Sequence, residues 1–354
     1  MASVRLWGLF VLLSGIPLVV LGFLAWRLVD QDRSLETQRL RERLDNSAAL
    51  IVHELDRRFA DWEGFLERSG EGHSAEVPPD TAYFHVSAPG VNDHRGLPIA
   101  FFPRRAPAVD LPSPVFADAE AVEFREGDFA KAAISYRALA RDNDPRIQAA
   151  AWVRLARCWR KLDRVSDALD VYATLGILAT TPVAGAPAEL VARRERIALF
   201  KLLPDPERIE DEARLLSAAL TAGRFNLDRP TYDFYAEAVG RPLPATPAIH
   251  LAHAVEAMWP GWQQQPSGRN AHNGERAFAA VWRQTPAGTA VLVGDVDRLI
   301  QPASSMLKNL QVELTLEDAS GRRAWGSVAP TATAVLKRTR ETGLPWTLRI
   351  APRN

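Results

Sequence analysis

The sequence predicts an α+β fold that begins with a membrane-spanning helix. Three observations support this: an uncharged apolar run near the N-terminus, long helical periodicity through the middle, and short strand-like runs in the last 80 residues. The chain has 354 residues. That length allows one membrane segment and one or two domains of roughly 100–200 residues each.

The composition excludes several classes of protein. Lys+Arg and Asp+Glu both total 43, so the net charge is zero, which argues against a nucleic acid as a partner. The hydrophobic share is 47% and the charged share 24%, as in ordinary globular domains. The single cysteine, Cys158, excludes an intrachain disulfide and a cysteine-based zinc cluster. Because Cys158 lies among Trp152, Leu155 and Trp159, we expect a buried structural thiol.

The predicted transmembrane helix is Leu6–Trp26, which follows a short tail of residues 1–5. This uncharged run would be roughly 31 Å long as a helix, the thickness of a bilayer core. Trp7 and Trp26 stand at its ends, where aromatic belts occur. A cleaved signal peptide is the alternative, but its apolar region would be shorter and followed by small residues. The sequence therefore favours an uncleaved anchor.

The charges that flank the predicted span favour a cytoplasmic domain. Arginines are frequent just after the span, from Arg27 to Arg43, and positive charge tends to stay inside. Long domains can cross regardless of this charge, so the charge pattern alone leaves the orientation open.

A long helix over residues 27–68 is predicted to follow the anchor. Apolar residues recur at spacings of three or four and form one stripe: Leu40, Leu44, Ala48, Ile51, Leu55, Phe59, Trp62 and Leu66. Such a helix has to pack on something. Two partners stay open at this point, the same helix of a second copy and the chain's own domain.

Two short strands are predicted next, Tyr83–Ser87 and Pro98–Phe102. Pro89-Gly90 and Asn92-Asp93 between them have the composition of turns. A proline-rich connector separates these strands from the helical middle of the chain.

The middle of the chain contains an internal repeat of 36 residues. Its equivalent positions are Phe129 and Val165, Ala132 and Ala168, and Tyr136 and Tyr172. A Gly-Asp-aromatic turn, then alanine, then an aromatic residue resembles the tetratricopeptide repeat (TPR), a helix–turn–helix unit of about 34 residues. The resemblance implies that the two alanines allow close helix contact while the tyrosines fill the space between units. A diverged pair of helical hairpins is the alternative.

Further elements follow in order. Each of the next predicted helices begins near a proline, as helix N-termini favour: Pro187–Leu203, Pro206–Ala222, Pro230–Val239 and Pro247–Met258. The last 80 residues predict strands Ala277–Trp282, Ala290–Val293, Val312–Leu316, Arg323–Gly326 and Pro345–Ile350, with a helix over Asp295–Leu310. Asp295 and Asp297 are expected to stabilise the N-terminus of that helix.

The C-terminal part resembles the closing half of a PAS-like, Cache-type sensor domain. The runs that carry the resemblance are Val293–Ile300, Leu316–Gly326 and the terminal Leu344–Ile350. With the anchor and the long helix, the chain resembles the N-terminal sensory portion of a bacterial membrane-bound sensor histidine kinase. The resemblance implies a small antiparallel sheet that pairs Tyr83–Phe102 with Ala277–Ile350, and a TPR-like insertion from Val115 to Met258.

The resemblance also implies a domain organisation. Residues 27–68 would be a signalling helix, residues 81–103 the first strands of the sensor domain, residues 115–258 the TPR-like segment and residues 275–350 its closing half. It further implies a single span in the inner (plasma) membrane, an extracytoplasmic domain and a homodimer through the long helix. ATP and Mg²⁺ would belong to a kinase core beyond Asn354, so no cofactor is expected in these residues.

Catalytic and metal-binding motifs are absent from the sequence. His53-Glu54-Leu55 superficially resembles a phospho-acceptor box but has no ATP-binding domain beside it, so we predict no catalytic residue. His250 and His253 have the spacing of two metal ligands on one helix face, with Glu256 as the one local carboxylate. Ordinary surface or interface histidines are the favoured interpretation, and no metal site is predicted.

A candidate ligand pocket is predicted where the helical segment meets the C-terminal strands. Its aromatic and charged residues are Trp259, Trp262, His272, Arg276 and Trp282. The favoured alternative is that these tryptophans seal a seam between segments.

Two functions remain after the sequence analysis. The first is signal input for a two-component kinase, in which an unknown small ligand or protein shifts a two-state equilibrium and displaces the long helix. The second is a membrane-anchored repeat scaffold that binds other proteins. The sequence after residue 354 would distinguish them.

Overall fold

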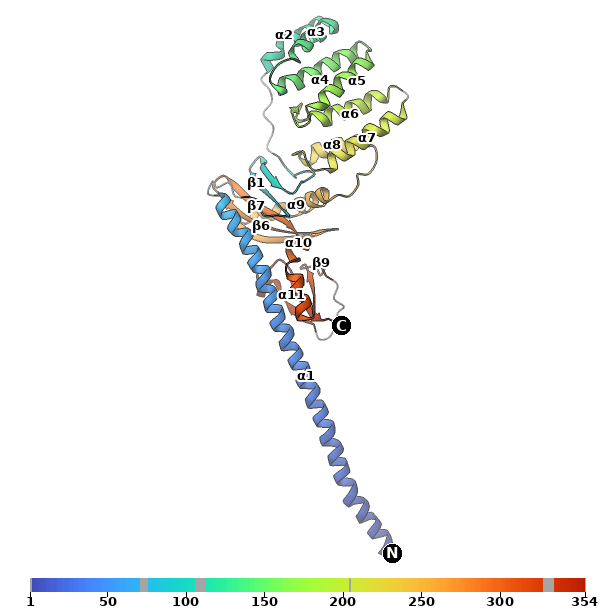
Figure 1. Ribbon diagram of the computed structural model, residues 1–354, viewed down its shortest axis with the longest axis vertical. Helices are drawn as coiled ribbons and strands as arrows, with labels where there is room; N and C mark the ends of the chain where they lie inside the picture. The colour runs from blue at the N-terminus through green and yellow to red at the C-terminus, as the bar shows by residue number, and fades with distance from the viewer. Residues whose placement is uncertain (1, 71–75, 106–112, 204, 327–333, 354) are drawn as a thin grey trace. The chain divides into compact units, whose positions relative to one another are not determined.

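The computed structural model describes residues 2–70, 76–105, 113–203, 205–326 and 334–353. These residues form an α+β fold of helices and antiparallel sheets, as predicted (Figure 1). Two compact units are present. Unit 1 comprises Met1–Arg58 and Asp297–Asn354, and unit 2 comprises Phe59–Val296.

The first helix, α1 (Ala2–Gly70), contributes residues to both units. It contains the predicted long helix, since neither proline nor glycine interrupts residues 30–63. The predicted stripe is buried from Leu44 to Leu66. In unit 1 its surroundings include Leu310, whose carbonyl oxygen accepts from Arg43 Nη2 at 3.3 Å. The chain's own domain thus covers the stripe, which answers the question that the sequence left open.

The predicted transmembrane helix, Leu6–Trp26, lies within α1. Most of its side chains are outside the described residues; Phe23 and Trp26 are described and are exposed. In the parts of the chain whose side chains are described, no helix has the length and apolar character needed to cross a bilayer.

A five-stranded antiparallel sheet organises unit 2. Its order is β2-β1-β7-β6-β5, and its strands are β1 (Thr81–Ser87), β2 (Gly90–Gly96), β5 (Ser267–Asn273), β6 (Ala277–Thr285) and β7 (Gly288–Asp295). The prediction of a strand at Pro98–Phe102 is wrong: Gly90–Gly96 pairs with β1 instead. Residues 99–102 are buried, but their backbone bonds go outside the sheet, with Ala100 N donating to Ala248 O at 3.1 Å and Phe102 N donating to Leu227 O at 2.9 Å.

The two faces of this sheet bury different sets of residues. Strand register places Phe84, Val291, Trp282 and Gly268 in one row, and these residues alternate with neighbours that face the other way. Trp262 of α9 (Pro247–Gln264) packs against Phe84, with ring centroids 5.5 Å apart. α9 therefore lies over this face, which we call the α9 face.

The C-terminal end of α1 lies over the opposite face of the same sheet. Phe65 packs edge-on against Tyr83 at 5.6 Å, and Arg269 Nε donates to Glu63 Oε1 at 2.6 Å. The sheet is thus covered by one helix on each side.

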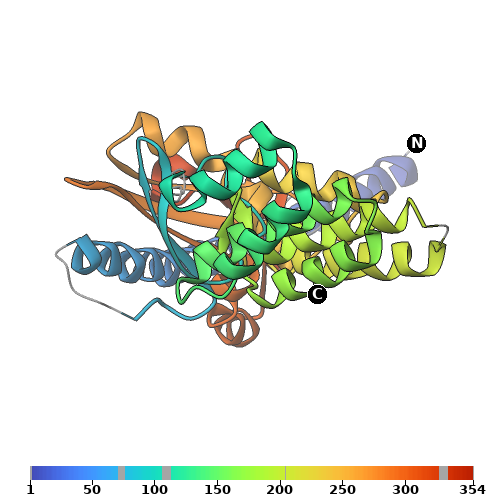
Figure 2. The ribbon, with the colours of Figure 1, turned by 90° about the horizontal axis from the view of Figure 1, so that it is seen from above.

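Between β2 and β5 the chain forms a helical array. Its elements are η1 (Ser113–Phe116), α2 (Ala117–Ala121), the π-helical turn η2 (Val122–Glu126), α3 (Phe129–Leu139), α4 (Pro145–Lys161), α5 (Val165–Ile177), α6 (Ala188–Phe200), α7 (Pro206–Thr221) and α8 (Arg229–Val239). A short hairpin, β3 (Pro182–Val183) and β4 (Ala186–Pro187), precedes α6. Consecutive helices from α3 to α8 contact one another (Figures 1 and 2).

Aspartates and prolines explain where these helices begin. Asp144 and Asp205 cap α4 and α7 through bonds to backbone N–H groups, and a proline follows each cap. Thr246 caps α9 in the same way, before Pro247. The four helices predicted after the repeat are confirmed, with shifts of a few residues at their ends.

The repeat register predicted from the sequence is present in the array. α3 begins at Phe129 and α5 at Val165, 36 residues later. The equivalent alanines and tyrosines are buried, while Phe129 and Val165 pack at the edge of the core. The buried members are Ala132, Tyr136, Ala168 and Tyr172.

The C-terminal part of unit 1 forms a second sheet. Its order is β10-β11-β8-β9, from β8 (Val312–Glu317), β9 (Arg323–Trp325), β10 (Val335–Lys337) and β11 (Thr347–Pro352). The prediction of one sheet spanning Ala277–Ile350 is wrong, because β6 and β7 pair in unit 2 and β8 and β11 pair with each other in unit 1. The predicted helix Asp295–Leu310 is two helices, α10 (Val296–Ile300) and α11 (Ala303–Leu310), separated at Pro302. The short α12 (Thr339–Thr342) precedes β11.

Candidate functional site

Two ion pairs in the array join residues that are 34 positions apart. Arg154 Nη2 lies 2.8 Å from Glu120 Oε1, and Arg157 Nη2 lies 2.6 Å from Glu123 Oε2. Both arginines are on α4, one turn apart, while the glutamates are on α2 and η2. The separation equals the usual length of a tetratricopeptide unit. It is two residues less than the repeat that relates α3 to α5. The pairs connect α4 to α2 and η2, the short helical elements that precede α3.

A further set of contacts leads from α4 to α6 and α8. Arg160 Nη1 donates to Glu195 Oε2 at 2.9 Å, and Arg194 Nη1 donates to Glu195 Oε1 at 2.6 Å. The guanidinium of Arg194 then lies 4.3 Å from the ring centroid of Phe234 on α8. At the other end, the Arg157 guanidinium lies 5.0 Å from the Phe124 ring.

We call this line the arginine strip, consisting of Phe124, Arg154, Arg157, Arg160, Arg194 and Phe234. Its contacts fall into groups: Phe124 with Arg157, Arg154 with Glu120, and Arg160 with Arg194 and Phe234 through Glu195. Arg154, Arg157 and Arg160 follow one another at three-residue spacing along α4, which joins these groups into one surface over η2, α4, α6 and α8. Phe124 and Phe234 are 66% and 49% exposed, which is high for aromatic residues.

Exposure is distributed unequally within the ion pairs of the strip. The side chain of Arg157 is 38% exposed and that of Glu123 is 1% exposed; for Arg160 and Glu195 the values are 44% and 19%. Arg154 and Glu120 are equally exposed. The outer surface of the strip is therefore dominated by guanidinium groups, while most of the compensating negative charge lies beneath it.

Glu123 connects the strip to the core of the array. Tyr136 Oη donates to Glu123 Oε2 at 2.8 Å, and both side chains are buried. Burial and this hydrogen bond raise the pKa of Tyr136 above its usual value, and the bonds to Glu123 raise the pKa of Arg157. The carboxylate thus has a buried phenol on one side and a half-exposed guanidinium on the other.

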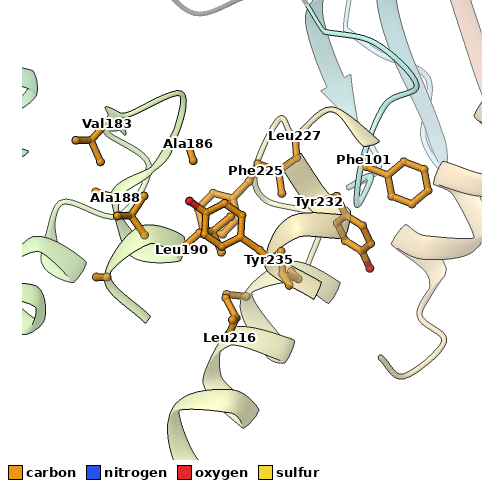
Figure 3. Packing of buried hydrophobic residues seen from close by; sticks show 14 of the residues in the cluster. Phe101, Val183, Ala186, Ala188, Leu190, Leu216, Phe225, Leu227, Tyr232 and Tyr235 are labelled. Carbon is orange, nitrogen blue, oxygen red and sulfur yellow. The ribbon is translucent and has the colours of Figure 1, made fainter. Parts of the chain in front are cut away.

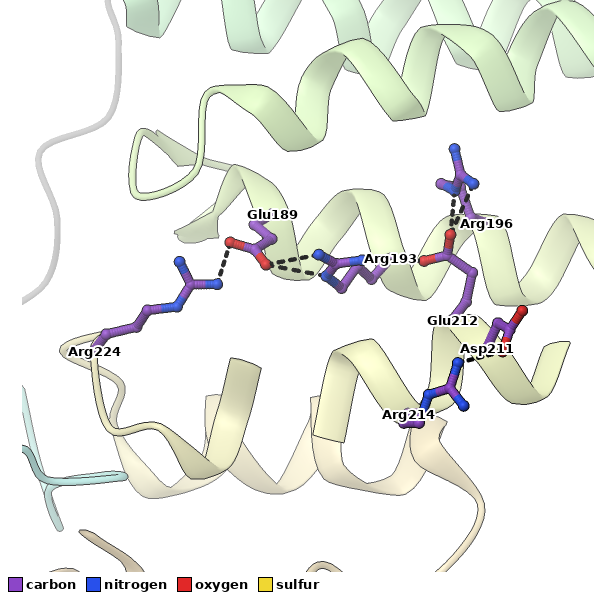
Figure 4. Close-up of polar contacts among 7 residues, drawn as sticks. All are labelled: Glu189, Arg193, Arg196, Asp211, Glu212, Arg214 and Arg224. Carbon is purple, nitrogen blue, oxygen red and sulfur yellow. Dashed lines mark hydrogen bonds and ion pairs between the residues drawn. The ribbon is translucent and has the colours of Figure 1, made fainter. Parts of the chain in front are cut away.

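A second charged network connects α6, α7 and the segment after α7. The buried carboxylates Glu189 and Glu212 are bridged by Arg193, at 3.0 and 3.4 Å respectively (Figure 4). Arg196 also pairs with Glu212 at 2.7 Å, and Arg224 pairs with Glu189 at 2.5 Å. Because each buried charge has a partner, the network compensates much of the cost of desolvating its charges.

Residues 223–229 join the array to the segment that follows β2. Phe102 N donates to Leu227 O at 2.9 Å, and Arg229 N donates to Phe102 O at 2.8 Å. Phe101 packs against Tyr232 of α8 at 4.9 Å (Figure 3). We call residues 223–229 and 97–102 together the joint.

Two residues constrain the joint: Gly223, which belongs to it, and His94, which contacts Leu97 and Phe102. His94 Nε2 lies 2.9 Å from Leu97 O, and its ring packs against Phe102 at 5.4 Å. Burial lowers the pKa of His94, against the opposing effects of hydrogen bonds to Leu97 and Asn226. Gly223 has φ +64°, and a Cβ there would lie 2.9 Å from Ile99 N.

The predicted ligand-pocket residues fall into two groups on the α9 face. Trp259 and Trp262 are neighbours on α9 with ring centroids 5.8 Å apart, and Trp282 Nε1 donates to Gln265 O at 3.0 Å. The second group lies around the β5–β6 hairpin, where His272 is opposite Phe278 and Arg276 forms an ion pair with Asp295. Phe278 and Trp282 are four residues apart on β6, roughly 13 Å along the strand. The structure therefore places the tryptophans near α9, and it places His272 and Arg276 at the hairpin end of the same face.

Two buried polar atoms on the α9 face have no hydrogen-bond partner among the described residues. They are Trp262 Nε1, a donor, and Asn270 Oδ1, an acceptor. A Cβ on Gly261 of α9 would lie 3.4 Å from Asn270 Nδ2, so Asn270 lies directly beneath α9. Unsatisfied buried groups of this kind are typical of places that hold water or a ligand.

The remaining candidate residues have ordinary surroundings. His53 is exposed on α1, His250 Nδ1 lies 3.7 Å from Glu275, and His253 Nδ1 lies 3.8 Å from Glu256. In the described ranges, no group of three or more His, Cys, Asp or Glu residues could hold a metal ion. Asp297 lies in the first turn of α10.

Cys158 is fully buried and has no disulfide partner, and burial raises the pKa of its thiol to about 11. A high pKa leaves little thiolate near neutral pH, so a reactive role is disfavoured.

Sequence reasoning missed the arginine strip and the joint. The signal for the strip was present: Glu120 and Glu123 precede Arg154 and Arg157 by 34 residues, close to the repeat length of 36. Apolar positions define the repeat register, and charged residues are usually taken as a solvated surface, so their periodicity escaped notice. The joint has no such signal.

Comparison with known proteins found no matching family model, no similar curated protein and no similar solved structure.

Proposed function

We propose that this chain is the signal-input portion of a bacterial two-component sensor histidine kinase. Leu6–Trp26 would anchor it in the inner membrane, and the two units would lie on the extracytoplasmic side. The catalytic core, with its ATP and Mg²⁺, would follow Asn354. The helical array would be a TPR-like insertion in a PAS-like domain.

The order of the five-stranded sheet is the observation that carries this proposal. The first two strands lie beside the last strand of the domain, and a long helical segment separates β2 from β5. That arrangement is the one expected of a PAS-like domain. A helix that precedes β1, as α1 does, is also expected in the Cache-type group.

α1 is suited to transmit a change from unit 2. The Trp62 ring packs over Gly294 of β7, where a Cβ would lie 2.6 Å from that ring, and Glu63 is held by Arg269 of β5. A shift of the sheet would therefore displace the end of α1, and α1 continues as one helix into unit 1. A ligand that binds one arrangement better than the other would change their populations.

The α9 face supports a small-molecule stimulus. Trp262 Nε1 and Asn270 Oδ1 offer one donor and one acceptor within an aromatic layer, a combination that small-ligand sites use. The predicted homodimer through α1 would use the face opposite the buried stripe, where Leu35 and Leu50 are exposed.

Phosphorylation of the complete gene product tests the proposal. The reading frame past Asn354 would be sequenced, and the encoded polypeptide expressed in membranes and incubated with labelled ATP. We expect acid-labile phosphohistidine. A stop codon at that point, or a continuation without kinase activity, would refute the proposal.

A variant pair tests whether α1 carries the signal. Arg269→Ala removes the partner of Glu63 on α1. We expect it to change the rate of autophosphorylation, whereas Arg214→Ala on the surface of α7 leaves the rate unchanged. Equal rates in all three proteins would exclude transmission through this contact.

The second candidate is a membrane-anchored scaffold in which the array binds other proteins. The arginine strip favours it, since it is a continuous exposed surface of arginine and aromatic residues, the types enriched at interfaces. A scaffold would bind its partner without any effect on phosphorylation.

A further inference from the structure

We propose that the arginine strip binds an acidic, extended segment of a partner protein. The proposal rests on the proposed function in one respect: it assumes that the helical array is the part that receives an external stimulus. It is argued from three properties of the strip: its charge, its continuity and its aromatic ends.

The charge of the exposed layer selects an acidic partner. Within the pairs Arg157–Glu123, Arg160–Glu195 and Arg194–Glu195, the guanidinium is the more exposed member; Glu123 is buried and Glu195 is partly buried. An approaching chain therefore meets cationic groups before it meets the glutamates beneath them. Each guanidinium has five N–H donors and uses one or two of them in these pairs. Carboxylates of a partner can therefore accept hydrogen bonds from the N–H groups that still face solvent.

The continuity of the strip selects an extended partner. The strip runs from η2 to α8 over four elements, η2, α4, α6 and α8, which alternate in the chain with α3, α5 and α7. Contacts between side chains join one element to the next, and the step from Arg157 to Arg160 follows α4 itself. At interaxial distances of about 8–10 Å, three helix-to-helix steps span roughly 25–30 Å. An extended segment of roughly eight or nine residues covers that distance.

The aromatic ends select apolar side chains among the acidic ones. Phe124 and Phe234 are exposed at opposite ends of the strip, and each has an arginine against its ring. Arginine and large aromatic residues are over-represented among the positions that carry most binding energy. A partner with an aromatic or large aliphatic residue near each end would bury both rings.

Fluorescence anisotropy of the complete chain with a synthetic probe tests this inference. The probe is a labelled peptide of about twelve residues with repeating Glu-Leu-Asp-Phe, somewhat longer than the segment needed to cover the strip. Its control has Gln and Asn in place of the acids. We expect the acidic peptide to bind at least ten-fold more tightly than the control, and binding to weaken as salt rises.

The variant R160Q/R194Q removes two guanidinium charges while both sites keep polar side chains. We expect it to weaken binding of the acidic peptide at least ten-fold. The matched control is R208Q/R214Q, because both of these arginines lie on α7 outside the strip and pair with a nearby aspartate. The control pair should bind like the unmodified protein.

Phe124→Ala provides a variant with little risk to folding, because that ring is 66% exposed. It should weaken the acidic peptide several-fold and leave the circular dichroism spectrum unchanged. Equal affinity for the acidic and neutral peptides, or equal loss in R160Q/R194Q and R208Q/R214Q, would overturn the proposal. Equally tight binding of a DNA duplex would also overturn it, since the strip would then attract any polyanion. The phosphorylation assay is independent of these results, so either proposal can fail alone.

Discussion

Glu123 of η2 and Arg157 of α4 form a bidentate ion pair within the helical array. Arg157 Nε donates to Glu123 Oε1 and Nη2 donates to Oε2, both at 2.6 Å. The carboxylate is buried and also accepts from Tyr136. Parallel N–H···O bonds of this kind fix the geometry as well as the charge. The pair therefore sets how α4 lies against η2 and, through Tyr136, against α3.

Removing one member of this pair should destabilise the array. Arg157→Ala leaves the buried Glu123 carboxylate with Tyr136 as its remaining donor. We expect this change to lower the unfolding free energy by about 2–3 kcal/mol. Breaking a fully buried ion pair would cost more, but Arg157 is half-exposed. Urea unfolding measures the change. The double variant Glu123→Gln with Arg157→Ala should recover part of the loss, since a neutral amide tolerates burial better. A double variant as unstable as the sum of the single variants would show that the two residues are not coupled.

The joint should respond to a single methyl group at Gly223. Gly223→Ala places a Cβ in contact with Ile99 and Ala248 and requires a positive φ that alanine disfavours. We expect the unfolding free energy to fall by about 2–3 kcal/mol, from backbone strain at residue 223 and displacement of the neighbouring residues together.

Gly240→Ala is the matched control for the joint. Its φ is +73°, but no atom lies within 4 Å of the added Cβ. Its unfolding free energy should fall by only about 1 kcal/mol, the cost of the backbone conformation alone. Equal losses in the two variants would mean that residues 97–102 do not pack against Gly223 in solution.

Lowering the pH should weaken the joint through His94. Burial lowers the pKa of His94, so the folded state binds this proton less readily than the unfolded state, whose histidine has a pKa near 6.5. The contribution of His94 to the unfolding free energy is therefore present above about pH 6.5, and it is lost as the pH falls through and below that value. The negative charge of Asp93 opposes the shift.

A His94→Gln variant identifies the group responsible. Glutamine can keep a hydrogen bond to Leu97 O without titrating in this range. The unfolding free energy of the variant should depend less on pH between 7 and 5 than that of the unmodified protein. An identical pH dependence would assign the effect to another group.

The sequence predicted the helices of the array well because their ends carry local signals. Asp144-Pro145, Asp205-Pro206 and Thr246-Pro247 provide a cap and a first-turn proline wherever a helix begins. Such signals act over a few residues and need no tertiary context.

The strands were predicted less well because tertiary contacts decide them. Gly90–Gly96 contains turn-forming residues but is held as a strand by β1, while the apolar Ile99–Phe102 is buried without being a strand. β5 has no apolar alternation, since it lies at the sheet edge and its polar Asn270 faces α9. The division into two sheets likewise depends on which strands pair, which no local pattern specifies.

The candidate site was predicted only in part. Trp259 and Trp262 do lie together on the α9 face, because both are on one helix. His272 and Arg276 lie at the hairpin end of the sheet, a position set by strand register rather than by their closeness in sequence. The arginine strip depends on contacts between repeats, which the apolar repeat pattern does not reveal.

A comparison of two tryptophans distinguishes a ligand pocket from a sealed seam. Trp282→Phe loses ring volume and the hydrogen bond to Gln265 O, whereas Trp262→Phe loses ring volume and a donor that has no partner among the described residues. We expect Trp282→Phe to be the more destabilising change by about 1 kcal/mol, the net value of one hydrogen bond. Thermal unfolding monitored by circular dichroism measures both. If Trp262→Phe proves the more costly change, its indole N–H has a partner in solution, such as a bound water or small molecule, and the α9 face is a pocket. Equal stability losses would indicate that the Trp282 hydrogen bond contributes nothing and that ring packing alone seals this layer.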